Sequence, residues 1–105
     1  MQFHELSARA IEIHRKFAET AGRKNFPAWT REQVVQGFVG DVGDLVKLAM
    51  AKNGARHIED VDRKFAHELS DCLWSVLVIA KLYGVALEKE FPATMDAIEA
   101  KLESS

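Results

Sequence analysis

Apolar side chains recur every three or four residues along four segments of this chain, and no segment sustains the alternation of a half-buried strand. The segments run from Phe3 to about Thr20, from Thr30 to about Lys52, from near Asp60 to Tyr83, and from Leu87 to about Leu102. This periodicity predicts an all-α chain of four helices.

The helix ends carry local signals as well. Thr30 followed by Gln33 matches a capping box, in which each side chain bonds the other residue's backbone N–H. Gly84 is suited to stop the third helix, since glycine readily adopts the left-handed conformation found just past helix ends. The stretch from Asn53 to His57 is typical of a turn and lies between the second and third helices.

Length and composition narrow the class of protein. A chain of 105 residues fits one domain, residues 1–105. With a net charge of −2, the chain lacks the excess of positive charge typical of nucleic-acid-binding proteins. No apolar run is long enough to span a membrane. The single cysteine, Cys72, excludes an internal disulfide, and the first residues lack the pattern of a secretory signal. We therefore expect a cytoplasmic protein without nucleic-acid or membrane partners.

Two pairs of acids, Asp41/Asp44 and Glu68/Asp71, nest around position 56 in the predicted turn. In an antiparallel helical hairpin, Asp41 would lie opposite Asp71 and Asp44 opposite Glu68. Residues three apart are neighbours on a helix surface, so the four carboxylates would converge on one patch. Such a cluster repels itself unless a hard cation with oxygen ligands lies in its middle.

The direction of these acids leaves two interpretations open. The apolar stripe of the second helix centres on Val42 and Ala49, which would place Asp41 roughly 90° and Asp44 roughly 150° from the core direction. Acids at such positions usually form a solvated face. The glycines at 37, 40 and 43, and the apolar Trp74 and Val78 beyond Asp71, favour a covered flank instead.

The motifs themselves resemble a known family. Residues 39–45 read V-G-D-V-G-D-L and residues 68–74 read E-L-S-D-C-L-W, which is similar to the MazG-like all-α nucleoside triphosphate pyrophosphohydrolases. Residues 14–17, H-R-K-F, and 82–87, L-Y-G-V-A-L, extend the resemblance over most of the chain. The nearest pattern is that of the dCTP pyrophosphatase group, V-G-E-V-G-E-L. This chain has aspartate at 41 and 44 where that group has glutamate, and Ser75 where it has tyrosine.

The resemblance implies a MazG-type, four-helix bundle-like fold with a metal site between the second and third helices. Its ligands to Mg²⁺, or Mn²⁺, would be Asp41, Asp44, Glu68 and Asp71. The implied reaction is hydrolysis of a nucleoside triphosphate to monophosphate and pyrophosphate, as in nucleotide-pool sanitisation. Asp41, Glu68 and Asp71 would be the catalytic carboxylates.

Five further residues are candidates for substrate binding: His14, Trp29, Lys47, Trp74 and Lys101. The resemblance implies that His14 touches a base and that Lys101 binds phosphate. Trp29 has the chemistry to stack on a base, Trp74 adjoins the acidic patch, and Lys47 lies one turn beyond Asp44. For each residue an ordinary structural role, in helix packing or in a surface ion pair, is the alternative.

Three functions remain in competition: the pyrophosphohydrolase, a phosphoribosyl-ATP pyrophosphatase-like enzyme, and a non-catalytic helical bundle that binds nucleotide or partner helices. We also expect a homo-oligomer, a dimer or a dimer of dimers. A single chain cannot easily cover Trp74, Val78 and the glycine positions as well as its core, and the resemblance implies the same assembly.

Overall fold

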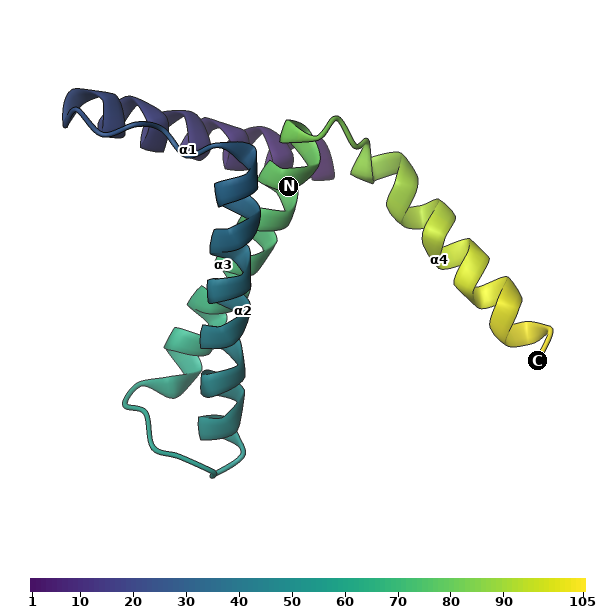
Figure 1. The fold of residues 1–105 in the computed structure, drawn as a ribbon. Coiled ribbons are helices and arrows are strands. Elements are labelled where there is room, and N and C mark those ends of the chain that lie inside the picture. The colour runs from purple at the N-terminus through teal and green to yellow at the C-terminus, as the bar shows by residue number, and fades with distance from the viewer.

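Four α-helices make up the computed structural model, which describes residues 1–105, and the chain contains no strand (Figure 1). The helices are α1 (Phe3–Arg23), α2 (Arg31–Lys52), α3 (Val61–Leu82) and α4 (Leu87–Glu103). The predicted all-α class, the number of helices and their approximate bounds are therefore confirmed.

The predicted start of α2 and end of α3 are found in detail. Thr30 Oγ1 accepts a hydrogen bond from the Gln33 N–H at 3.2 Å, and Gln33 Oε1 accepts one from the Thr30 N–H at 2.9 Å. Gly84 has φ of 72°, and the next N–H, of Val85, donates to the Ala80 carbonyl at 2.8 Å. The left-handed glycine therefore ends α3 and turns the chain towards α4.

Helices α2 and α3 form the predicted antiparallel hairpin, with a slightly different register. Lys52 forms an ion pair with Asp62, and the Ser75 hydroxyl donates to Asp41 Oδ2. The midpoint between Lys52 and Asp62 is position 57, and the midpoint between Asp41 and Ser75 is position 58. The axis of the hairpin therefore lies one to two residues beyond the predicted position 56.

Helix α1 crosses the hairpin and completes a small core of Ala10, Val34, Leu77 and Val78. Trp74 packs against this core, and its indole Nε1–H donates to the Ala10 carbonyl at 3.0 Å. Val78 is completely buried. Val78 is therefore covered within the single chain and Trp74 is half-buried against α1, whereas the predicted second copy stays a prediction.

The direction predicted for the apolar stripes is also wrong. Val42 on α2 is 39% exposed and Leu69 on α3 is 47% exposed, whereas Asp41 is half-buried and Glu68 buried. Helix α2 is apolar on two sides and can turn only one of them to α3. The side it turns carries Val34, Gly37 and Leu48 together with Asp41. Asp41 and Glu68 therefore lie within the helix interface, whereas Asp44 remains exposed.

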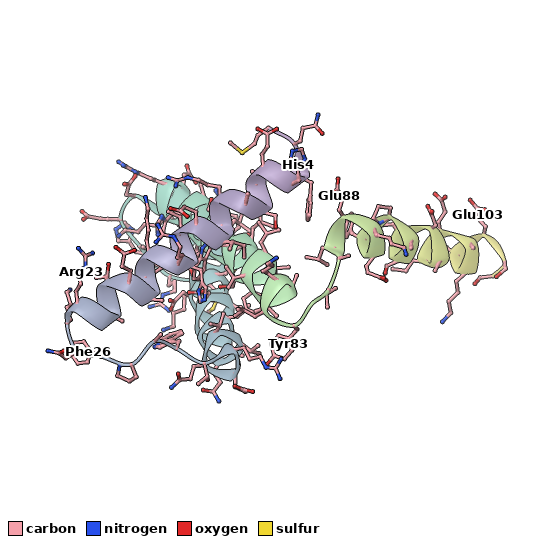
Figure 2. All side chains as sticks on the ribbon, turned by 90° about the horizontal axis from the view of Figure 1, so that it is seen from above. His4, Arg23, Phe26, Tyr83, Glu88 and Glu103 are labelled. Carbon is pink, nitrogen blue, oxygen red and sulfur yellow. The ribbon has the colours of Figure 1, made fainter.

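Helix α4 does not join the other three helices. It has no buried residue, and both views show it leading away from them (Figures 1 and 2). Helix α4 therefore does not shield the core in the single chain. No individual helix is long and apolar enough to cross a membrane; α3 and α4 pass that test only as a pair, and they are bent by 108°.

Candidate metal centre and adjoining cavities

Three carboxylates meet between α2 and α3. Asp41 and Asp44 lie one turn apart on α2, and Glu68 faces them from α3. One oxygen from each side chain lies within 4.8 Å of the others. The hairpin therefore gathers three anionic oxygens in the space that a single cation would occupy.

Glu68 is the most constrained of the three. Its side chain is only 9% exposed, and Oε1 is fully covered yet has no hydrogen-bond partner. Burial raises the pKa of Glu68 above its ordinary value, and the charges of Asp41, Asp71 and Asp44 raise it further. A buried carboxylate oxygen without a partner is destabilising unless a cation or a proton neutralises it.

This donor set fits a hard divalent cation. Magnesium takes oxygen ligands and is commonly held by one or two carboxylates together with water and substrate phosphate. The cluster offers carboxylate oxygens alone, and the unpartnered Oε1 of Glu68 lacks the positive partner that such an ion would provide. Asp41, Asp44 and Glu68 are therefore the residues that would hold Mg²⁺ or Mn²⁺.

Asp71, the fourth predicted ligand, lies beside this cluster and not in it. Its Oδ2 is 3.2 Å from His67 Nε2, one turn earlier on α3. The shifted register of the hairpin accounts for the difference, because Ser75, one turn further along α3, now faces Asp41. The structure thus assembles three of the four predicted ligands and leaves Asp71 half-buried at the edge of the cluster.

Ser75 positions Asp41. Ser75 is 98% buried, and its hydroxyl donates to Asp41 Oδ2 at 3.2 Å, so one oxygen of the carboxylate is fixed while the other remains available. The sequence marked Ser75 only as a departure from the tyrosine of the resembling group.

A cavity of about 810 Å³ opens on one side of the carboxylates. Its walls come from α1, the loop before α2, and the facing parts of α2 and α3. Three of the predicted substrate-binding residues, His14, Trp29 and Trp74, line it together with Asp41 and Asp71. We call this space the aromatic cavity.

The rings of the aromatic cavity are held by specific contacts. Trp74 is fixed by its bond to Ala10, and the Phe17 ring meets it edge-on with centroids 5.8 Å apart. The ring centroid of His14 lies 6.4 Å from that of Trp74. This position is compatible both with the predicted base contact and with packing against an aromatic ring. Such rings provide flat apolar surfaces on which a planar ligand can stack.

A second space, of about 500 Å³, opens on the other side of the carboxylates, at the turn end of the hairpin. Seven of its nine lining residues are polar or charged: the acids Asp44, Asp60 and Glu68, and the basic side chains Lys47, Arg63, Lys64 and His67. We call it the basic hollow. The predicted residue Lys47 lies here. Lys101 lines neither space; it belongs to α4, the helix that leads away from the other three (Figure 2).

Sequence reasoning missed His67 and Arg63. His67 lines both the aromatic cavity and the basic hollow, and Arg63 lies one turn before it on α3. The spacing of Arg63, His67 and Asp71, each four residues from the next, places them on one face of α3 and was a usable signal.

Comparison of this chain with family models, with curated proteins and with solved structures gives no match.

Gly37 sets the position of the Trp29 ring. A Cβ atom at residue 37 would lie 2.6 Å from Trp29 Cζ3, whereas one at Gly40 would meet nothing within 4 Å. We expect Gly37→Ala to move the Trp29 ring while the helices stay folded, and Gly40→Ala to leave the ring unmoved and to stabilise α2 by up to about 1 kcal/mol. The indole N–H signals in NMR spectra test this: the Trp29 signal should shift in Gly37→Ala alone. An unchanged Trp29 signal in that variant would contradict the packing described.

Glu68→Gln should stabilise the metal-free protein at about pH 7, by about 1 kcal/mol, because a neutral amide replaces a buried, unpartnered anion. A carboxyl whose pKa is raised by folding favours the folded state at low pH, and this contribution is lost as the pH rises through the folded-state pKa. The advantage of the variant over the wild type should therefore shrink as the pH falls. Urea unfolding in EDTA at about pH 7 and about pH 4.5 measures both effects.

The exposed Glu99→Gln on α4 is the matched control and should change little at either pH. Millimolar Mg²⁺ should raise the melting temperature of the wild type but not of Glu68→Gln, since an ion that binds only the folded state stabilises it. Equal responses of the two proteins to Mg²⁺ would exclude Glu68 as a ligand.

Proposed function

We propose that this protein is a Mg²⁺-dependent nucleoside triphosphate pyrophosphohydrolase, releasing a nucleoside monophosphate and pyrophosphate. One observation carries the proposal: a buried carboxylate with an unpartnered oxygen lies within a three-carboxylate cluster between α2 and α3. The resemblance of the two acidic motifs to MazG-like enzymes points to the same chemistry.

The surroundings of the cluster support a nucleotide as substrate. The aromatic cavity provides rings for a base on one side, and the basic hollow provides cations for phosphates on the other. A nucleoside triphosphate has the same sequence of parts: a flat base, a sugar, and a chain of phosphates that binds divalent cations. The cluster would then lie beside the phosphate nearest the sugar.

The carboxylates divide into two roles. Asp41, Asp44 and Glu68 would hold the cation, which, when bound, neutralises charge on the phosphate oxygens and lowers the pKa of water. Asp71 lies outside the cluster, and its contact with His67 would hold the carboxylate in place to orient the attacking water and accept its proton. His14, Trp29 and Trp74 would bind the base, and Lys47 would bind phosphate.

A phosphoribosyl-ATP pyrophosphatase-like activity and a non-catalytic bundle are the competing functions. Both are compatible with helices that carry acidic residues, and both are separated from the proposal by the same assay. A panel of nucleoside triphosphates and phosphoribosyl-ATP, incubated with Mg²⁺, distinguishes a hydrolase from a binding protein and identifies its substrate.

The wild-type protein should release pyrophosphate from at least one nucleoside triphosphate in the presence of Mg²⁺. Asp71→Asn and Glu68→Gln should each lower the rate by about 100-fold or more, since each removes a charge needed for general-base or metal catalysis. Circular dichroism should show unchanged helix content in both. The control Asp96→Asn, on exposed α4, should retain full activity. Release of nucleoside diphosphate and orthophosphate instead would refute the reaction class.

We also infer a homo-oligomer with two-fold symmetry, either a dimer or a dimer of dimers. The side of α2 turned away from α3 carries exposed Val35, Val39, Val42 and Val46, and α3 exposes Leu69, Leu73 and Val76. Soluble monomers rarely leave so much apolar surface uncovered. A second copy of the chain is the simplest cover, because each copy carries the same unpartnered stripes and a symmetric contact pairs like with like.

Sedimentation at micromolar concentration should give a dimer or a tetramer for the wild type. Val39 is 68% exposed in the single chain, so Val39→Lys would not disturb the fold of one copy but would place a charge in the contact. We expect this variant to shift to monomers. Ala8→Lys, on the exposed side of α1, should keep the wild-type assembly. A wild-type monomer would refute the inference.

A further inference from the structure

Helix α4 is the part of the chain that the fold leaves without a neighbour. It has no buried residue, and only seven of the 105 residues of the whole chain are buried. The Cα radius of gyration is 16.9 Å, whereas a compact domain of this length has about 13 Å. Figure 1 shows the cause, since α4 leads away from the other three helices. The single chain is therefore extended for its length because of α4.

Helix α4 nevertheless has the sequence of a packed helix. Four large apolar side chains, 41% to 70% exposed, lie on one face at intervals of four, three and four residues: Phe91, Met95, Ile98 and Leu102. We call this face the α4 stripe. Apolar side chains at this spacing normally pack against a second helix. The α4 stripe is therefore one half of a contact between two helices.

Helix α3 offers a matching surface. One face carries a row at the same intervals of four, three and four residues, made of three exposed side chains and one half-buried alanine: Leu69, Leu73, Val76 and Ala80. We call this row the α3 stripe. Helix α1 packs on Trp74 and Val78, which lie roughly 150° round α3 from the row. The α3 stripe is therefore not covered by α1, and it equals the α4 stripe in length and spacing.

Charge distinguishes between the possible partners of α4. The helix carries five acids and two lysines, a net charge of −3, and since the whole chain has −2, all other residues together carry +1. Two α4 helices side by side would therefore repel each other. Helix α3 has three acids and three Lys or Arg residues, so α4 meets no net repulsion there. The α4 stripe thus fits the α3 stripe better than it fits a second α4.

The chain does not make this contact within one copy. The Val85 N–H donates to the Ala80 carbonyl at 2.8 Å at the end of α3, and the Ala86 carbonyl accepts from the Glu90 N–H at 2.9 Å at the start of α4. These bonds leave no slack linker between the two helices. The bend of 108° between them is too small for α4 to return antiparallel along its own α3.

We propose that α4 of one copy packs along the α3 stripe of a second copy, so that two copies exchange their α4 helices about a two-fold axis. Exchange of an identical element is a low-cost route to a dimer, and symmetry makes the contact twice. The inference rests on the homo-oligomer inferred above, in which the α2 valines meet across the axis. It adds that α4 holds the partner, and it does not depend on the chemistry of the carboxylates.

Mixing two charge variants tests the exchange. Leu73→Lys alters only the α3 stripe and Ile98→Glu only the α4 stripe, and both side chains are about half exposed in the single chain, so each copy should still fold. The dissociation constant of each variant's dimer should rise by about 100-fold or more, because a charge leaves water at both contacts. An equimolar mixture should associate again, since a mixed dimer has one wild-type contact and one with two opposite charges. Sedimentation of the two variants and of the mixture measures these effects.

Ala100→Glu is the matched control, because it adds the same charge to the exposed side of α4 opposite the stripe. It should assemble as the wild type does. A wild-type dimer that persists in Ile98→Glu would overturn the exchange and leave the α2 contact in place. Variants that stay monomeric when mixed would place α4 on its own chain and overturn the exchange as well. Neither outcome changes the result of the hydrolysis assay, which tests the proposed function separately.

Discussion

The burial of Glu68 between α2 and α3 is the constraint on which the rest of the structure depends. A helix interface normally excludes charge, yet this one encloses a carboxylate beside two others. The surrounding packing accommodates it: the Ser75 hydroxyl donates a hydrogen bond to Asp41, and Gly37 leaves room for the Trp29 ring against α2. The covered Oε1 of Glu68 has no partner, so this part of the interface is destabilising unless a cation or a proton neutralises the carboxylate.

The two spaces beside the carboxylates differ because different parts of the fold build them. The aromatic cavity requires α1 and the loop before α2, which bring His14, Phe17 and Trp29 towards Trp74. The basic hollow requires only the hairpin and its turn. Its cations come from the first turns of α3 and from α2, and Asp44, Asp60 and Glu68 line the same space without forming ion pairs with them. The division into an apolar side and a charged side therefore follows from the order of the helices.

Much of the fold could be predicted from the sequence, because its signals are local. The Thr30 and Gln33 cap, the Gly84 stop and the helical periodicity each depend on residues within one or two turns. The direction in which α2 faces could not be predicted, since a helix apolar on two sides gives no local reason to choose either. The choice depends on α3, and it reversed the expected positions of Val42 and Asp41.

The same contrast holds for the site. The pairing of α2 acids with Glu68 followed from spacing alone, but the exclusion of Asp71 depended on a register shift of one to two residues, which no local signal encodes. His67 and Ser75 acquire their roles only through side-chain contacts, with Asp71 and with Asp41. Their importance was therefore not evident before the helices were placed.

All three carboxylates of the cluster belong to one helical hairpin, residues 31–82, and this affects the order of folding. Contacts within a hairpin join residues that are close in the chain, and such contacts form quickly. The aromatic cavity forms only when α1 docks on the hairpin, because its rings come from α1 and the loop before α2 as well as from α3. A divalent cation could therefore be captured by the growing hairpin before any surface for a base exists, and would act first as a folding cofactor.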